Sequence, residues 1–414
     1  MASLPREARA RGSARVHPAK PPTSPRGFAT LPRMIDFELT EEQNALVETA
    51  RRFVKERVIP VAKECDRESR FPMEVFKEAW KLGFVNPTLD AEFGGAGLSD
   101  LDSTFITEEL AYGCTGIQTS ITANTLGLTP IRLAGTEQQK KKYLGWLSSE
   151  PIHCSYATTE PGAGSDVAGL RTKATKQADG SYVLNGQKAW ITNANFAAFY
   201  IIFATENAEL RHKGIGSFIV HRDAKGLSVG KHEDKLGQRA SDTAVVTLED
   251  VHVPAGQVLA PPGQGFKLAM ETFNQTRPDI GAGALGLMRR CLDECVVYAR
   301  ERKTFGQPIS QHQLVQAMIA EMAIRIEATS LLVRKAAWNL DKGVRNPVVS
   351  SYAKAYGADS AMATAIDAVQ IFGGNGYTKE YPVEKLMRDA KILQIYEGTS
   401  QIQRIVIAKN ILGA

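Results

Sequence analysis

Long apolar runs are missing from this 414-residue sequence. The longest, residues 196–204, has nine residues, whereas a helix needs about 20 to cross the hydrocarbon core of a bilayer. The sequence therefore contains no candidate transmembrane helix. Its composition, 43% hydrophobic and 23% charged, is that of a globular protein, and its length predicts two or three domains.

Cysteine is also scarce, and its distribution argues against disulfide bonds and against a metal site. The five residues are odd in number, scattered, and without histidines at the spacing of metal ligands. We therefore expect a reduced, intracellular chain with no metal site. The residues are Cys65, Cys114, Cys154, Cys291 and Cys295.

Acidic residues are nearly absent from residues 1–33, which hold six arginines, one lysine and a single acid, Glu7. This segment carries a net charge of +6, so the rest of the chain is close to neutral and offers no basic face for nucleic acid. It also lacks the apolar stretch of a secretory signal and resembles a mitochondrial presequence, with a matrix-processing site near Arg26 to Ala29. The predicted location is the mitochondrial matrix, and the alternative is a disordered extension in a bacterial cytoplasm.

The rest of the chain changes its apolar period twice. Residues 34–150 have helical spacing with capping boxes at 40–43 and 136–139. Residues 151–262 alternate with period two, and residues 263–414 return to long helices. We predict an α+β fold that is mainly α: an N-terminal helical domain, a middle antiparallel β barrel or sandwich, and a C-terminal four-helix bundle.

Several motifs allow both a structural and a functional interpretation. Asn185-Gly186 predicts a hairpin turn between the strands 182–184 and 188–192. The glycine-rich loop 159–166 is either a tight turn or a cradle for an anion or a flat ring. Trp190 either flanks a planar cofactor or fills a small β core. The segment 302–306 either ends a helix or forms a pyrophosphate or adenine site. The segment 370–377 is another glycine-dense turn after a helix, and it allows close approach to the backbone.

The segment 394–404 places a carboxylate, Glu397, between Tyr396 and Gly398. The aromatic ring can supply a rigid wall, and the glycine leaves room for a ligand to approach the backbone. Thr399 or Ser400 can begin the next helix. A catalytic base and a plain helix break both fit these residues.

Taken together and in this order, the motifs resemble the acyl-CoA dehydrogenase family of flavoenzymes, most closely its medium-chain members. The resemblance runs from about residue 34 to the C-terminus. The motifs that carry it are residues 157–166, 190–192, 302–306, 370–376, 384–391 and 395–404.

The resemblance implies that FAD is the cofactor and assigns its contacts. Contacts within the subunit would be Tyr156, Thr158, Thr159, Gly164, Ser165, Trp190, Ile191, Thr192, Thr399 and Gln401. Contacts made to the FAD of a partner subunit would be Arg302, Thr304, Phe305, Gln313, Gln370, Gly373 and Gly374. The acyl-CoA substrate would contact Ser165, Asn274, Arg277, Tyr396 and Gly398. A site shared in this way implies a homotetramer built as a dimer of dimers.

The resemblance also implies a reaction in fatty acid β-oxidation. Glu397 would remove the α-proton of a saturated, medium-chain acyl-CoA, while the β-hydride passes to FAD and trans-2-enoyl-CoA forms. The Glu397 N–H and a ribityl hydroxyl would polarise the thioester carbonyl. Electrons would then pass to electron-transferring flavoprotein. Relatives that carry the base on another helix have it at the position of Thr276, which cannot serve.

Two positions depart from the family pattern. Thr158 stands where an apolar residue is usual, and Asn274 stands where medium-chain enzymes have an aspartate. The competing hypotheses are an oxidase or flavin hydroxylase on the same fold, and a non-enzymatic assembly partner. The sequence does not resolve the acyl length, and an apolar patch around Phe84 is one candidate surface for the electron acceptor.

Overall fold

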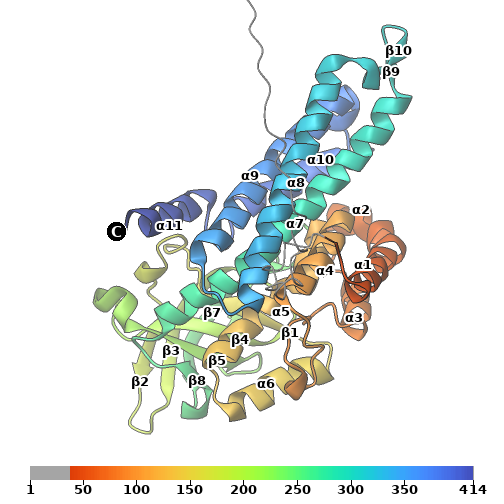
Figure 1. The fold of residues 1–414 in the computed structure, drawn as a ribbon. Coiled ribbons are helices and arrows are strands. Elements are labelled where there is room, and N and C mark those ends of the chain that lie inside the picture. The colour runs from red at the N-terminus through yellow and green to blue at the C-terminus, as the bar shows by residue number, and fades with distance from the viewer. Residues whose placement is uncertain (1–37, 414) are drawn as a thin grey trace, which may run out of the picture. The chain divides into compact units, whose positions relative to one another are not determined.

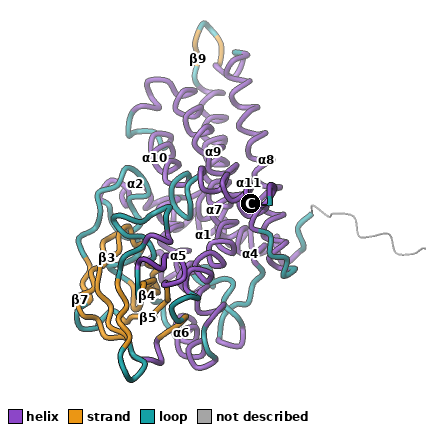
Figure 2. Tube along the Cα trace, turned by 90° about the vertical axis from the view of Figure 1, so that its left-hand side faces the viewer, coloured by secondary structure: helices purple, strands orange, loops and turns teal. Residues whose placement is uncertain are grey.

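The computed structural model describes residues 38–413, so the predicted presequence at 1–33 lies outside the described residues. Helices, then strands, then helices follow one another in chain order (Figure 1). This is the mainly helical α+β architecture that the apolar periods predict. In the view of Figure 2 the strands gather on one side and the helices form the rest.

The first part is helical, and α4 and α5 are its most buried members. At the start of α6, Thr136 and Gln139 make the predicted capping box: the Thr136 Oγ1 accepts from Gln139 N at 3.2 Å, and Gln139 Oε1 accepts from Thr136 N at 2.9 Å. Phe84 is 1% exposed and belongs to the core, so the apolar patch proposed around it is wrong. The helices are α1 (Glu41–Phe53), α2 (Ile59–Glu68), α3 (Met73–Lys81), α4 (Asp100–Gly113), α5 (Thr115–Ala134) and α6 (Glu137–Ser149).

The middle part is an eight-stranded sheet with the order β6-β7-β3-β2-β4-β5-β8, in which β1 also pairs with β4. The pairings are antiparallel except β1 with β4 and a single pair between β2 and β4. The strands are β1 (His153–Ala157), β2 (Lys173–Lys176), β3 (Tyr182–Thr192), β4 (Ala197–Thr205), β5 (Ile215–His221), β6 (Leu227–Val229), β7 (Thr243–Val253) and β8 (Val258–Ala260).

The predicted hairpin turn at Asn185-Gly186 is wrong, because β3 continues straight through it. Gly186 has φ +148°, and the register with β7 shifts between Leu184 and Gly186, as at a β-bulge. A Cβ at Gly186 would lie 2.8 Å from the Thr172 Cα. Gly186 therefore does have an unusual backbone conformation and a close neighbour, but it lies inside a strand and not in a turn.

The third part confirms the predicted bundle, since α7, α8, α9 and α10 pack against one another. A short hairpin of β9 and β10 joins α7 to α8 at the far end of the bundle (Figure 1). Of the helices in the described residues, none is long and apolar enough to cross a membrane. The elements are α7 (Gly265–Glu301), β9 (Lys303–Thr304), β10 (Gln307–Pro308), α8 (Gln313–Asp341), α9 (Pro347–Phe372), α10 (Val383–Leu393) and α11 (Ser400–Leu412).

Candidate active site

Glu397 lies in the tight connection between α10 and α11. Its φ is +50° and that of Gly398 is +87°, so two successive residues occupy the left-handed region. Glycine tolerates this conformation, whereas a glutamate there is strained. The Thr399 Oγ1 then accepts a hydrogen bond from Ile402 N at 3.2 Å and caps α11. The segment therefore begins α11 and also carries a carboxylate on a strained backbone.

The Glu397 carboxylate is held against α7. The Thr276 hydroxyl donates to its Oε2 at 2.7 Å. Burial raises the pKa of Glu397 above its ordinary value, although the Thr276 hydrogen bond and the positive charges of Arg277 and Lys354 oppose the rise. The result is a carboxylate that is a stronger base than one in water, with its direction set by a neighbouring hydroxyl.

The backbone beside Glu397 supplies a free donor and a fixed acceptor. Among the described residues, the Glu397 N–H has no hydrogen-bond acceptor. The Gly398 carbonyl accepts from Lys354 Nζ at 2.6 Å and from Gln403 Nε2 at 3.0 Å. Sequence reasoning missed Lys354 and Gln403. A single lysine in the small-residue stretch of α9, which is otherwise suited to burial, was the available signal for Lys354.

The predicted cofactor residues on or next to β1 and β3 offer groups that suit a flat, hydrogen-bonding molecule. The Tyr156 and Thr158 hydroxyls are buried, and neither meets the geometry of a hydrogen bond with any described residue. Trp190 is 61% exposed and has φ +62°, so it is not the buried core tryptophan of the alternative interpretation. Ile191 is buried behind it, and the Thr192 carbonyl accepts from Ser155.

The glycine-rich loop is anchored from beneath. Lys188 on β3 is fully buried and donates to the Thr158 carbonyl at 3.1 Å and to Glu160 Oε1 at 2.7 Å. The Glu160 carboxylate also accepts from the backbone N–H groups of Arg171 and Thr172, at 2.6 and 2.8 Å. The Thr159 carbonyl accepts from the backbone of β3 at 2.9 Å. This buried ion pair was not predicted from the sequence.

The tip of the loop faces outward. Gly164 and Ser165 are exposed, and a Cβ at Gly164 would meet nothing within 4 Å.

The predicted substrate residues on α7 lie near Glu397: the Asn274 Oδ1 accepts from Arg277 Nη1 at 2.7 Å. Arg277 is 4% exposed, and its Nε has no partner among the described residues. Gln401 is exposed on the first turn of α11.

A second group of predicted cofactor residues lies at the other end of the bundle. A hollow of about 280 Å³ is lined by Arg302, Thr304, Gly373 and Gly374. Phe305 is 96% exposed at the hairpin tip, and Gln313 and Gln370 are exposed without lining this hollow. Arg277 and Glu301 are 24 positions apart on α7, which is ~36 Å along a helix. One chain therefore does not bring the two groups together.

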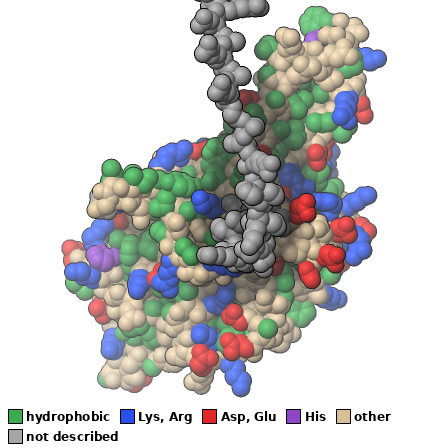
Figure 3. All heavy atoms as spheres, in the orientation of Figure 1, with side chains coloured by type: hydrophobic (Ala, Val, Ile, Leu, Met, Phe, Trp, Pro, Cys, Tyr) green, Lys and Arg blue, Asp and Glu red, His purple; other side chains and the backbone are tan. Residues whose placement is uncertain are grey.

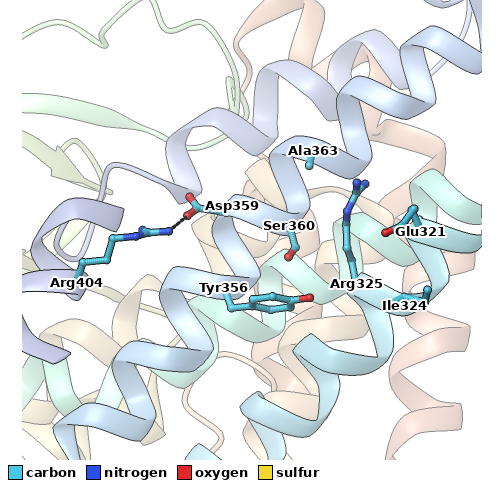
Figure 4. A pocket seen from close by; sticks show the side chains of 8 residues that line it. All are labelled: Glu321, Ile324, Arg325, Tyr356, Asp359, Ser360, Ala363 and Arg404. Carbon is cyan, nitrogen blue, oxygen red and sulfur yellow. Dashed lines mark hydrogen bonds and ion pairs between the residues drawn. The ribbon is translucent and has the colours of Figure 1, made fainter. Parts of the chain in front are cut away.

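Another hollow, of about 320 Å³, lies between α8, α9 and α11 (Figure 4). It contains none of the predicted site residues, but two of its lining residues, Asp359 and Arg404, form an ion pair at 2.6 Å. The three helices that form it carry exposed apolar side chains, and Figure 3 shows such side chains over α11 and the adjoining part of α9. They include Ile324, Leu331, Tyr352, Tyr356, Ile366, Ile405 and Ile411.

Comparison with known proteins adds independent information. The chain matches models of the N-terminal, middle and C-terminal domains of acyl-CoA dehydrogenases over residues 40–150, 155–251 and 263–412. It is 47% identical over 384 residues to a probable medium-chain specific acyl-CoA dehydrogenase 2, mitochondrial, of Caenorhabditis briggsae, covering 92% of this chain and 93% of the relative.

Solved structures agree. Butyryl-CoA dehydrogenase from Megasphaera elsdenii superposes with a TM-score of 0.89 at 38% identity, covering 91% of this chain and 100% of that one. A glutaryl-CoA dehydrogenase from Mycobacterium smegmatis, solved in complex with FADH2, gives 0.85 at 29% identity, covering 91% and 96%. By its sequence along nearly the whole described length and by its fold, the chain belongs to the acyl-CoA dehydrogenase family.

Proposed function

We propose that this acyl-CoA dehydrogenase oxidises saturated medium-chain acyl-CoA to trans-2-enoyl-CoA, with Glu397 removing the α-proton. The observation that carries the proposal is the Glu397 carboxylate itself. It is half-buried, desolvation raises its pKa, it is oriented by Thr276 at 2.7 Å, and it lies beside a backbone N–H with no partner among the described residues. The medium-chain preference is supported by the printed name of the Caenorhabditis relative.

The cofactor is FAD, and the residues around β1 and β3 fit it. The buried Tyr156 and Thr158 hydroxyls, the exposed Trp190 ring and Thr192 would hold the flavin, with the Thr399 hydroxyl and Gln401 beyond Glu397. When bound, FAD accepts the hydride that leaves the β-carbon of the acyl chain. The protein's part is to position the thioester, to exclude water and to take the α-proton.

Two features of the connection suit the removal of an α-proton. A carboxylate in a site with little water is a stronger base, because burial disfavours its charged form. A backbone N–H aimed at the thioester oxygen stabilises the negative charge that develops there. The Glu397 N–H is free for that task. Base and donor would thus come from one residue.

A second copy of the chain would complete the cofactor site. Along α7, Arg277 near Glu397 and Glu301 next to Arg302 are ~36 Å apart, so the two groups lie at different ends of the bundle. Arg302, Thr304, Gly373 and Gly374 line their hollow at the bundle's far end and would contact the FAD of a partner subunit. The apolar face of α8, α9 and α11 offers further contact area. Both features support the homotetramer.

The reduced enzyme would pass its electrons to electron-transferring flavoprotein in the mitochondrial matrix. The Arg-rich segment 1–33 and the mitochondrial name of the Caenorhabditis relative support this location. An oxidase is the alternative, because a prolyl acyl carrier protein oxidase shares the fold with a TM-score of 0.88 at 32% identity. Stopped-flow reoxidation by oxygen separates them: a dehydrogenase should react slowly while product is bound.

The test of the base is Glu397→Gln in the FAD-loaded enzyme. We expect turnover to fall by about 10²–10⁴-fold, with FAD content and acyl-CoA binding retained. Turnover within a factor of ten of wild type would refute the assignment. A profile of kcat/KM over acyl-CoAs of increasing length then tests the medium-chain preference, and equal values across the series would contradict it.

A further inference from the structure

Glu397 occupies a backbone conformation that its own side chain disfavours. A non-glycine residue at φ +50° costs of order 1–3 kcal/mol and persists only where the surroundings impose it. The next residue, Gly398, is also left-handed at +87°. Something outside the connection must therefore hold the two peptide units in place.

Two buried side chains make the necessary contacts. Gln403 on α11 donates from Nε2 to the Glu397 carbonyl at 3.1 Å and to the Gly398 carbonyl at 3.0 Å. Lys354 on α9 donates from Nζ to the same Gly398 carbonyl at 2.6 Å. Both side chains are 0% exposed. The fit is close, since a Cβ at Gly398 would lie 2.7 Å from Gln403 Nε2.

The same region of α9 holds the flanks of the connection through Asp359. Its carboxylate accepts from Gln394 Nε2 at 2.7 Å, from the Ser400 hydroxyl at 2.8 Å and from Arg404 at 2.6 Å (Figure 4 shows the last pair). Asp359 therefore fixes both ends of the segment, while Lys354 and Gln403 fix its centre. With those two carbonyls immobile, the φ of Glu397 sets the directions of its N–H and its side chain together.

Lys354 adds a charge to this contact. Its positive charge favours the ionised form of the Glu397 carboxyl. Burial lowers the pKa of Lys354 to about 8, with Glu397 opposing that fall, so the lysine is mainly charged at neutral pH. The other charged groups that act on it are Arg277 on α7 and Asp359 on its own helix. Gln403 makes similar contacts without a charge.

We propose that Lys354 and Gln403 are positioning residues for the catalytic base: together they hold the strained Glu397–Gly398 backbone, and Lys354 in addition places a positive charge beside the carboxylate. The proposal rests on the function proposed above for Glu397. It separates a geometric effect, which both residues share, from an electrostatic effect, which only the lysine can exert.

The experiment compares Lys354→Met, Lys354→Arg and Gln403→Met with wild type as FAD-loaded enzyme, measuring kcat, KM and the pH dependence of kcat. Lys354→Met should lower kcat at least tenfold with little change in KM, and move the acid limb of the profile up by about one pH unit, because removing a nearby cation raises the carboxyl's pKa. Lys354→Arg should return that limb toward the wild-type position. Gln403→Met should lower kcat without moving the limb.

Controls keep the result interpretable. Ser351→Ala is the matched variant on the same helix, because Ser351 is fully buried and its hydroxyl has no partner among the described residues; its kinetics should equal wild type. Each Gly398 contact leaves the other in place, so the single variants should fold, and the flavin spectrum reports their loading. If Lys354→Met and Gln403→Met, folded and loaded, keep kcat within twofold and the limb unmoved while Glu397→Gln is inactive, the proposal is wrong. An active Glu397→Gln would instead refute the function on which it rests.

Discussion

Replacing Lys188 with methionine isolates the ion pair beneath the glycine-rich loop. Lys188 is 0% exposed and bonds to Glu160 at 2.7 Å and to the Thr158 carbonyl at 3.1 Å. Removing one partner of a buried pair costs about 3–5 kcal/mol, because the other charge is left uncompensated. Glu160 would keep the N–H donors of Arg171 and Thr172. We therefore expect the lower end of this range, ~3 kcal/mol.

The cost should depend on pH. Burial tends to raise the pKa of Glu160, but Lys188 and the hydrogen bonds outweigh burial and hold it below its ordinary value. A depressed pKa stabilises the fold above the unfolded pKa, and this stability is lost as pH falls through the folded pKa. The difference between Lys188→Met and wild type should therefore be full near neutral pH and should narrow below about pH 4.

Hydrogen exchange on the FAD-loaded enzyme measures this loss of stability at the residues that bond to Glu160. A loss of ~3 kcal/mol should speed exchange of the Arg171 and Thr172 amides by about 100-fold, since about 1.4 kcal/mol is tenfold. The double variant Glu160→Gln with Lys188→Met removes both charges and should recover part of the protection. Exchange of the single variant within threefold of wild type would refute the reasoning. A double variant no better than the single would show that packing, not charge, matters.

Two further predictions concern α7. Burial, aided by Asp100 and Glu397, raises the pKa of Asp279 to about 8, so the native state loses stability as pH rises between about 4 and 8; Asp279→Asn should gain in Tm over wild type across that window, and a constant difference would contradict this. A Cβ at Gly286 would lie 2.1 Å from the Glu108 carbonyl of α4, so Gly286→Ala should cost at least ~2 kcal/mol in urea unfolding. Its control is Gly145→Ala in α6, where a Cβ meets nothing within 4 Å; equal stability of the two variants would contradict the close packing.

Apolar periodicity predicted the kinds and order of the elements because periods of 3.6 and two follow directly from helix and strand geometry. Apolar periodicity does not predict which strands pair with one another. Asn185-Gly186 has the composition of a hairpin turn, yet it lies within β3. The hairpin partner of β3 is β2, which precedes it across residues 177–181, and its other partner, β7, comes from a distant part of the chain. A local signal reports that positive φ is tolerated, but it does not say which strand lies alongside.

The candidate site also has one part that the sequence predicted and another that it did not. Family motifs pointed to Glu397, Trp190 and the far-end group around Arg302. Lys354 and Lys188 lie in no motif, and Glu160 and Gln403 lie in motifs that assigned them no role. Thr276 was set aside because a hydroxyl cannot act as the base, and yet it is the donor that orients the Glu397 carboxylate. Its role depends on α7 passing the connection between α10 and α11, a contact over 121 positions of sequence.

By itself the sequence determined the helix–sheet–helix order and the family, because these depend on local periods and on ordered motifs, and the same motifs led to the proposal of Glu397 as the base. Only the tertiary structure decided what surrounds that carboxylate: the hydroxyl that orients it, the buried side chains that hold its strained backbone, and the separation of the two cofactor groups. These features depend on distances between residues far apart in the chain. Hydrogen bonds and charge effects act over a few ångströms in space, whatever the separation in sequence.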